Sequence, residues 1–177
     1  HMLTHFGDRL LPHWPAQINH IFARLPGQLA ARANAPSHFT RLHGDANPGN
    51  MLVPKEGERP LYLIDQQPFD WSITTWSGTF DLAYVMALYW PTDLRRVLEI
   101  PVLRHYQLQL AARGITNYPW AQLHADYRLC VALMVPVAVE YMRDGGDPAW
   151  NNFRFGLVQR TLTAFDDLDC GELLKTK

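Results

Sequence analysis

Hydrophobic residues recur at helical spacing along most of this chain. Ile18, Ile21 and Leu25, for example, share one face of a helix predicted over 15–33. Further helices are predicted from 79 or 81 to 90, from 92 or 93 to 113, over 120–143, and from 147 onward. Residues 3–14 are expected to be irregular or one short helix. Pro26, Pro101 and Pro136 are expected to kink, bend or break the helices that contain them.

The pattern changes between residues 39 and 64, where the apolar runs are too short for helices. Residues 39–42 are predicted to be extended, and strands are predicted over 51–53 and 61–64, joined by a polar turn over 54–60. An aromatic loop is expected over 66–78. These elements predict an α+β fold class, a mostly helical domain with one small β-hairpin.

Composition narrows the class of protein. The chain has 177 residues, a formal net charge of −1 and 47% hydrophobic residues, which suits one domain with a sizeable core. The near-neutral charge gives no reason to expect a nucleic-acid partner. The longest apolar run, 129–139, is too short to span a membrane, and no signal peptide is recognisable. Cys130 and Cys170 are expected to be buried thiols in a cytoplasmic protein.

Candidate chemistry lies at the ends of the predicted hairpin. Asp45 and Asn50 flank the loop that contains Asn47, Pro48 and Gly49, and Asp65 follows the second strand. A hairpin brings the end of its second strand back beside the loop that precedes its first strand. Phosphoryl transfer uses this set of groups, with one carboxylate to receive a proton, and an amide and a second carboxylate to hold magnesium.

These residues also resemble a known family. The order H-G-D-x-x-x-x-N over 43–50, the strand ending in Asp65, and F-D-L-A-Y over 80–84 resemble the aminoglycoside phosphotransferase and choline kinase group, including its ecdysteroid-kinase-like branch. The resemblance covers mainly residues 41–90, with a weaker similarity over 164–174. It implies a protein-kinase-like C-terminal lobe. It further implies Asp45 as catalytic base, Asn50 and Asp65 as magnesium ligands, and ATP and Mg²⁺ as cofactors.

Other residues receive weaker assignments. His43 and Asp81 are expected to be structural, with Asp81 as a helix cap that ties the aromatic loop down. Asn47, Gln67, Trp71 and Trp76 are candidates for substrate binding, although exposed polar residues and core tryptophans look the same in sequence. The chain departs from the family at Gln66, where an aromatic residue is usual, and in the length of 67–78.

The resemblance also implies an N-terminal nucleotide-binding lobe that supplies a lysine. Residues 1–42 show no strand with such a lysine, and 1–2 look like a cloning remnant. We therefore expect 3–177 to be the C-terminal lobe alone, inactive without its own N-terminal lobe, with an alcohol as substrate. Two alternatives stay open. One is a non-catalytic kinase-derived module that binds a protein partner, and the other is a metal-dependent hydrolase, for which a further ligand is lacking.

Overall fold

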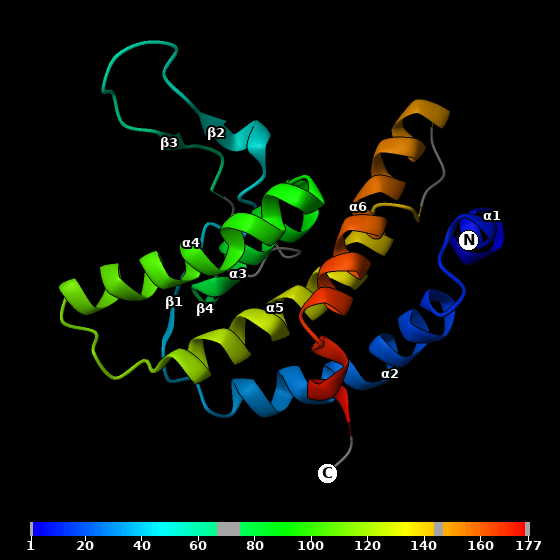
Figure 1. Cartoon of the computed structure of the whole chain (residues 1–177), viewed down its shortest axis with the longest axis horizontal. Coiled ribbons are helices and arrows are strands. Elements are labelled where there is room, and N and C mark those ends of the chain that lie inside the picture. Colours follow the sequence, from blue (N-terminus) through cyan, green and yellow to red (C-terminus); the bar gives the residue numbers. More distant parts are fainter. Residues whose placement is uncertain (1, 67–74, 144–146, 176–177) are drawn as a thin grey trace.

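The computed structural model confirms an α+β fold that is mostly helical (Figure 1). It describes residues 2–66, 75–143 and 147–175. Short 3₁₀ turns at 7–9, 48–50 and 170–174 and a π-helical segment, Tyr84–Tyr89, accompany the main elements. The main elements are α1 (Met2–Phe6), α2 (Trp14–Ala33), β1 (Phe39–Arg41), β2 (Met51–Leu52), β3 (Tyr62–Leu63), β4 (Thr75–Ser77), α3 (Thr79–Ala83), α4 (Thr92–Ala112), α5 (Trp120–Glu140) and α6 (Pro148–Asp167).

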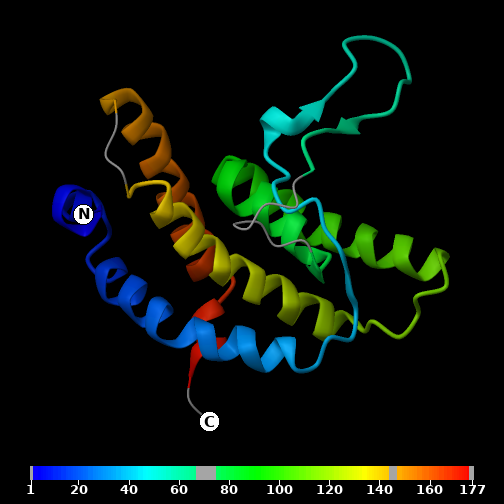
Figure 2. The same ribbon diagram turned by 180° about the vertical axis from the view of Figure 1, so that it is seen from behind.

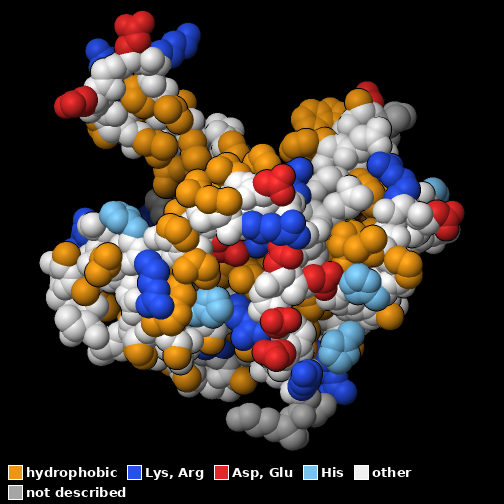
Figure 3. Space-filling view, in the orientation of Figure 1, with side chains coloured by type: hydrophobic (Ala, Val, Ile, Leu, Met, Phe, Trp, Pro, Cys, Tyr) orange, Lys and Arg blue, Asp and Glu red, His pale blue; other side chains and the backbone are white. Residues whose placement is uncertain are grey.

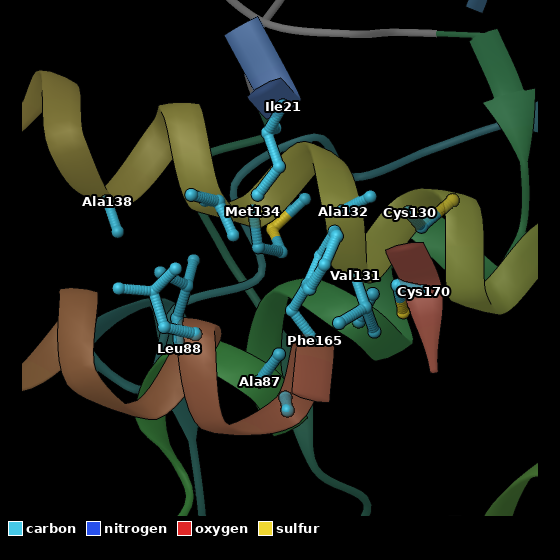
Figure 4. Close-up of a cluster of buried hydrophobic side chains, with 14 of the residues drawn as sticks. Ile21, Ala87, Leu88, Cys130, Val131, Ala132, Met134, Ala138, Phe165 and Cys170 are labelled. Atoms are coloured by element: carbon cyan, nitrogen blue, oxygen red, sulfur yellow. The ribbon is translucent and has the colours of Figure 1, made fainter. Parts of the chain in front are cut away.

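Helix α5 forms the centre of the molecule, packed against α2, α3 and α6. It is apolar on nearly all sides, as expected of a helix surrounded by others. Figure 4 shows Val131, Ala132 and Met134 of α5 among side chains from the other elements. Leu88 comes from the π-helical segment and Phe165 from α6, and both are buried. Because α5 contacts both α2 and α6, it links the N-terminal and C-terminal parts of the chain in one hydrophobic core.

The helix ends follow recognisable local signals. Asp147 caps α6, because its side chain accepts a hydrogen bond from the Ala149 backbone N–H at 2.7 Å. Helices α2 and α4 continue through Pro26 and Pro101, so neither proline breaks its helix. Pro136 lies within the single helix α5, as predicted. Pro26 and Pro101 are exposed, where water can satisfy the carbonyl groups that a proline leaves unpaired.

The predicted hairpin is present, and a second strand pair was not foreseen. Strands β2 and β3 are antiparallel, with Met51 opposite Leu63 and Leu52 opposite Tyr62. Strand β4 lies within the stretch expected to be a loop, and it pairs antiparallel with β1, placing Trp76 opposite Thr40. The loop prediction was therefore wrong at 75–77. This pairing joins residues distant in the sequence, so the local pattern did not reveal it.

The start of α3 also differs from the prediction. The helix begins at Thr79 after Gly78, and no side chain caps it, so neither Thr79 nor Asp81 has the predicted capping role. Asp81 lies in the first helical turn, and its carboxylate reaches the loop at residues 43–44 instead. The helix then widens into the π-helical segment Tyr84–Tyr89.

A buried polar cluster ties α2 to α5. The Asp126 carboxylate accepts hydrogen bonds from Arg32 at 2.7 Å and from the Tyr118 hydroxyl at 2.7 Å. Asp126 is itself buried, so these partners compensate for its lost hydration. Cys130 and Cys170 are both free and buried, as predicted. Within the described ranges, no helix has the length and apolar character needed to cross a membrane.

Candidate functional site

The candidate site is built around Asp45, in the loop between β1 and β2. Asn47 donates a hydrogen bond from Nδ2 to Asp45 Oδ1 at 3.0 Å. Asn50 donates from Nδ2 to Asp45 Oδ2 at 3.1 Å and to the Asp45 carbonyl oxygen at 2.9 Å. The Asn47 side-chain oxygen in turn accepts from the Gly49 backbone N–H at 2.8 Å. The loop therefore fixes both oxygens of one half-buried carboxylate.

Tyr84, from the π-helical segment, and Tyr141, at the end of α5, complete the surroundings of Asp45. The Tyr84 hydroxyl donates to Asp45 Oδ1 at 2.8 Å and lies 2.8 Å from the Tyr141 hydroxyl. Burial, followed by the hydrogen bond with Tyr141, raises the pKa of Tyr84 far above its usual range. The neutral Tyr84 hydroxyl is thus placed to donate to Asp45.

Asp65 is brought back to the same loop through Ile64. The Ile64 backbone N–H donates to the Asn50 carbonyl at 2.9 Å, and the Ile64 carbonyl accepts from His43 Nε2 at 2.9 Å. Asp65 follows directly, with a left-handed backbone at φ 60° that Asp adopts more readily than most residues. Its side chain is exposed. The residue that precedes Asp65 is thus fastened to both Asn50 and His43.

His43 and Asp81 hold the loop in place. The Asp81 carboxylate accepts from the backbone N–H groups of His43 at 2.8 Å and Gly44 at 3.0 Å. The His43 ring is buried and donates from Nε2 to Ile64. Both residues therefore help to hold the Asp45 loop in place. The predicted tie between Asp81 and the aromatic loop concerns a stretch of which 67–74 lie outside the described residues.

The four candidates for substrate binding are not all gathered here. Asn47 lies beside Asp45, as described above. Trp76 lies in β4, where its ring packs against Phe39 with centroids 4.5 Å apart, close to Leu29 and Leu133. Gln67 and Trp71 lie outside the described residues. The neighbouring Gln66 donates from its side chain to the Leu42 carbonyl at 2.8 Å, so it helps to fix the strand that enters the loop.

A pocket of about 610 Å³ opens beside Asn47, and most of its wall was not anticipated. Its size lies within the range of small-molecule sites. Its lining consists of Asn47, Pro48, Gly49, Tyr89, Tyr141, Trp150, Phe153, Arg154 and Leu157.

Two sequence patterns are compatible with the positions of Tyr84 near Asp45 and of the α6 residues in the pocket, but neither pattern places them there by itself. Tyr84 lies three positions after Asp81, so both side chains can reach the same loop from one helical turn. On α6, Trp150, Phe153, Arg154 and Leu157 follow the i, i+3, i+4, i+7 spacing of a single face. Leu157 is buried, whereas Trp150 is 61% and Phe153 48% exposed.

The donor chemistry at the site suits a hard cation. The Asn50 amide points its nitrogen at Asp45, which leaves the amide oxygen as the atom available to a metal, and Asp65 offers a carboxylate. In the part of the chain that the structure describes, no group of three or more His, Cys, Asp or Glu side chains is placed to hold a metal ion. The predicted ligand set includes an amide, and magnesium binding stays a prediction.

Comparison of the chain with protein-family models, with curated proteins and with solved structures finds no match.

Proposed function

We propose that this chain is the C-terminal lobe of an ATP-dependent small-molecule kinase that phosphorylates an alcohol. The observation that carries the proposal is the Asp45 carboxylate, held by Asn47, Asn50 and Tyr84 beside a pocket of small-molecule size. Its protein-kinase-like architecture, its family and its substrate are parts of the same proposal. They rest on the H-G-D-x-x-x-x-N spacing and on this geometry.

Asp45 serves as the general base. Asp45 Oδ1 already accepts from both Asn47 and Tyr84, whereas Oδ2 accepts from Asn50. A carboxylate oxygen has two lone-pair sites, so Oδ2 retains one for the substrate. The acceptor hydroxyl gives its proton to Oδ2, and its oxygen forms a bond to the γ-phosphorus of ATP. The bond between that phosphorus and the β,γ-bridging oxygen breaks, and ADP leaves.

Asn50 and Asp65 would hold magnesium. When bound there, the ion would offset the negative charge of the nucleotide phosphates. The chain's own contribution is to keep both side chains on segments joined by the Ile64 to Asn50 hydrogen bond. His43 and Asp81 add rigidity by fixing the backbone on either side of that joint.

The exposed β2–β3 hairpin is an argument for a partner unit that packs against it, such as the N-terminal lobe. It stands away from the helices (Figures 1 and 2), with charged side chains at its tip and hydrophobic side chains along its arms (Figure 3). Tyr62 is 58% exposed and Val53 67% exposed. An apolar surface of this kind marks an interaction site. Its exposed apolar residues are Leu52, Val53, Leu61, Tyr62, Leu63 and Ile64.

The test is phosphate transfer from labelled ATP to a panel of alcohols, run on the longest natural form of the protein. Asp45→Asn keeps the size of the side chain and removes the base, and should lower the rate by about 10²- to 10⁴-fold. Asp8→Asn, at an exposed position on the 3₁₀ turn 7–9, is the matched control and should leave the rate unchanged. Transfer that survives Asp45→Asn at full rate would rule out the assignment of the base.

The exposed apolar hairpin also favours a second candidate, a non-catalytic module that binds a protein partner. In that case the natural protein would transfer no phosphate to any alcohol, and it would still bind a partner through the hairpin. Replacing the exposed Val53 with Asp should weaken that binding, whereas Asp45→Asn should not affect it.

A further inference from the structure

We propose that the pocket beside Asn47 takes an alcohol that carries a flat ring system and an anionic group, with Arg154 as the residue that binds the anion. That the ligand is an alcohol rests on the proposed function. That it carries a ring and an anionic group is inferred from the pocket alone. Among kinase substrates it favours anionic cyclic acceptors over cationic ones.

Four of the nine residues that line the pocket are aromatic. Tyr89 comes from the π-helical segment, Tyr141 from the end of α5, and Trp150 and Phe153 from the first turns of α6. Trp150 and Phe153 stand almost perpendicular, at 86° with centroids 6.0 Å apart. They are 61% and 48% exposed, which is unusual for large aromatic residues that serve only in packing. Figure 3 shows hydrophobic side chains gathered at this end of α6. Such walls suit a flat ring that can stack.

The charge in the pocket is positive. Arg154 lines it, is partly buried, and has no hydrogen bond or ion pair with any described residue. Of the other buried or partly buried arginines among the described residues, Arg32 is paired with Asp126, Arg95 with Glu99 and Arg128 with Glu172, and Arg160 donates to the Leu88 carbonyl. Among the described residues that line the pocket, none is acidic. An unpaired guanidinium among aromatic rings is suited to a carboxylate or phosphate, and repels a cation.

The pocket is connected to the candidate base on two sides. Asn47 lines it and donates to Asp45 Oδ1 at 3.0 Å. Tyr141 lines it and lies 2.8 Å from the Tyr84 hydroxyl, which itself donates to Asp45. A ring held between α6 and the 47–49 loop is therefore separated from Asp45 by one hydrogen-bonded residue through Asn47, and by two through Tyr141 and Tyr84. The anion on Arg154 would set which hydroxyl of the acceptor faces the base.

The experiment compares three probes that share one ring and differ in charge: 2-naphthoate, 2-naphthylmethanol and 2-naphthylmethylammonium. Isothermal titration calorimetry on the chain, without nucleotide, measures each dissociation constant. We expect 2-naphthoate to bind about tenfold more tightly than the neutral alcohol, and the ammonium to bind most weakly. Equal binding of all three, or tightest binding of the ammonium, would overturn the assignment of an anionic ligand.

Substitutions then locate the probe. Arg154→Gln should weaken 2-naphthoate about tenfold and leave 2-naphthylmethanol nearly unchanged, whereas Arg24→Gln, on the exposed side of α2, should change neither. Trp150→Leu should weaken both probes, and Phe22→Leu, an exposed aromatic on α2, is its control. Binding that is indifferent to Arg154 and Trp150 would overturn the inference. Circular dichroism checks that each variant is folded.

The outcome is separable from that of the proposed function. The titrations need no ATP. Anion-selective binding without any phosphate transfer would therefore contradict the proposed kinase activity and still support the assignment of the pocket. Phosphate transfer to cationic alcohols, without binding of 2-naphthoate, would contradict the assignment of the pocket and still support the proposed kinase activity.

Discussion

Tyr84 reaches Asp45 from a different part of the chain than the loop that carries the aspartate. The π-helical segment that contains Tyr84 is wider than an α-helix, and such segments are common at functional sites. Asn47 and Asn50 were recognisable as neighbours of Asp45 because they are close in sequence and lie in a turn with proline and glycine. The contact of Tyr84 depends on tertiary packing, which spacing alone does not define.

Replacing Tyr84 with Phe tests whether this contact matters. The variant removes the donor to Asp45 Oδ1 and leaves the Tyr141 hydroxyl without its partner, so we expect the free energy of unfolding to fall by about 1 kcal/mol. Urea denaturation measures this change, with the exposed Tyr62→Phe as the control. Equal free energies of unfolding for the two variants would show that the Tyr84 hydroxyl does not stabilise the fold.

At the scale of elements, the helices were predictable and the second strand pair was not. Helical spacing is set by residues within one or two turns, so α2, α4, α5 and α6 follow directly from the sequence. The pairing of β1 with β4 joins residues such as Thr40 and Trp76, and the loop composition around β4 hid its three extended residues. The α6 face with Trp150 was found as a helix, but its exposure was not, because periodicity identifies a face without showing what covers it.

Helix α4 is fastened to α5 and α6 by buried charges. Arg95 is almost fully buried, donates to Glu99 at 2.9 Å and also contacts Asp167 of α6. Glu99 is buried as well, and accepts from the Tyr127 hydroxyl of α5 at 2.7 Å. Each charge therefore depends on the others for its compensation.

Removing one member of this group should be costly. We expect Arg95→Met to lower the free energy of unfolding by about 3 to 5 kcal/mol, because it leaves Glu99 buried beside no cation. The double variant Arg95→Met/Glu99→Leu should regain much of that loss. Urea denaturation compares both with Arg24→Met, an exposed substitution on α2 that should cost little. A double variant no more stable than the single one would contradict this account of the buried pair.

For the molecule as a whole, buried thiol and phenol groups determine how the free energy of unfolding changes at high pH. Burial raises the pKa of Cys130 from 9.0 to about 12, and that of Cys170 likewise to about 12. Burial also raises the pKa of Tyr89, Tyr118 and Tyr127 above the usual value. In the unfolded chain these groups lose their protons at lower pH than in the folded chain. The unfolded state then binds fewer protons, so stability falls as the pH rises.

We therefore expect full stability below about pH 8, and a loss of about 2 to 5 kcal/mol between pH 9 and pH 11 from the two thiols. The measurement is the free energy of unfolding in urea at a series of pH values under reducing conditions. The double variant Cys130→Ala/Cys170→Ala should lose the part of the slope that begins near pH 9 and keep the tyrosine part above about pH 10. A flat profile from pH 8 to pH 11 would contradict this expectation.

The most direct test of the central claim is whether the Asp45 loop and Asp65 bind one divalent cation. Paramagnetic Mn²⁺, a substitute for Mg²⁺, broadens the NMR signals of amides near its site. We predict that small additions broaden residues 43–50 and 64–66 first, and that Asp65→Asn abolishes this effect while the exposed Asp8→Asn preserves it. Broadening that spares both segments, or that persists unchanged in Asp45→Asn/Asp65→Asn, would contradict the account.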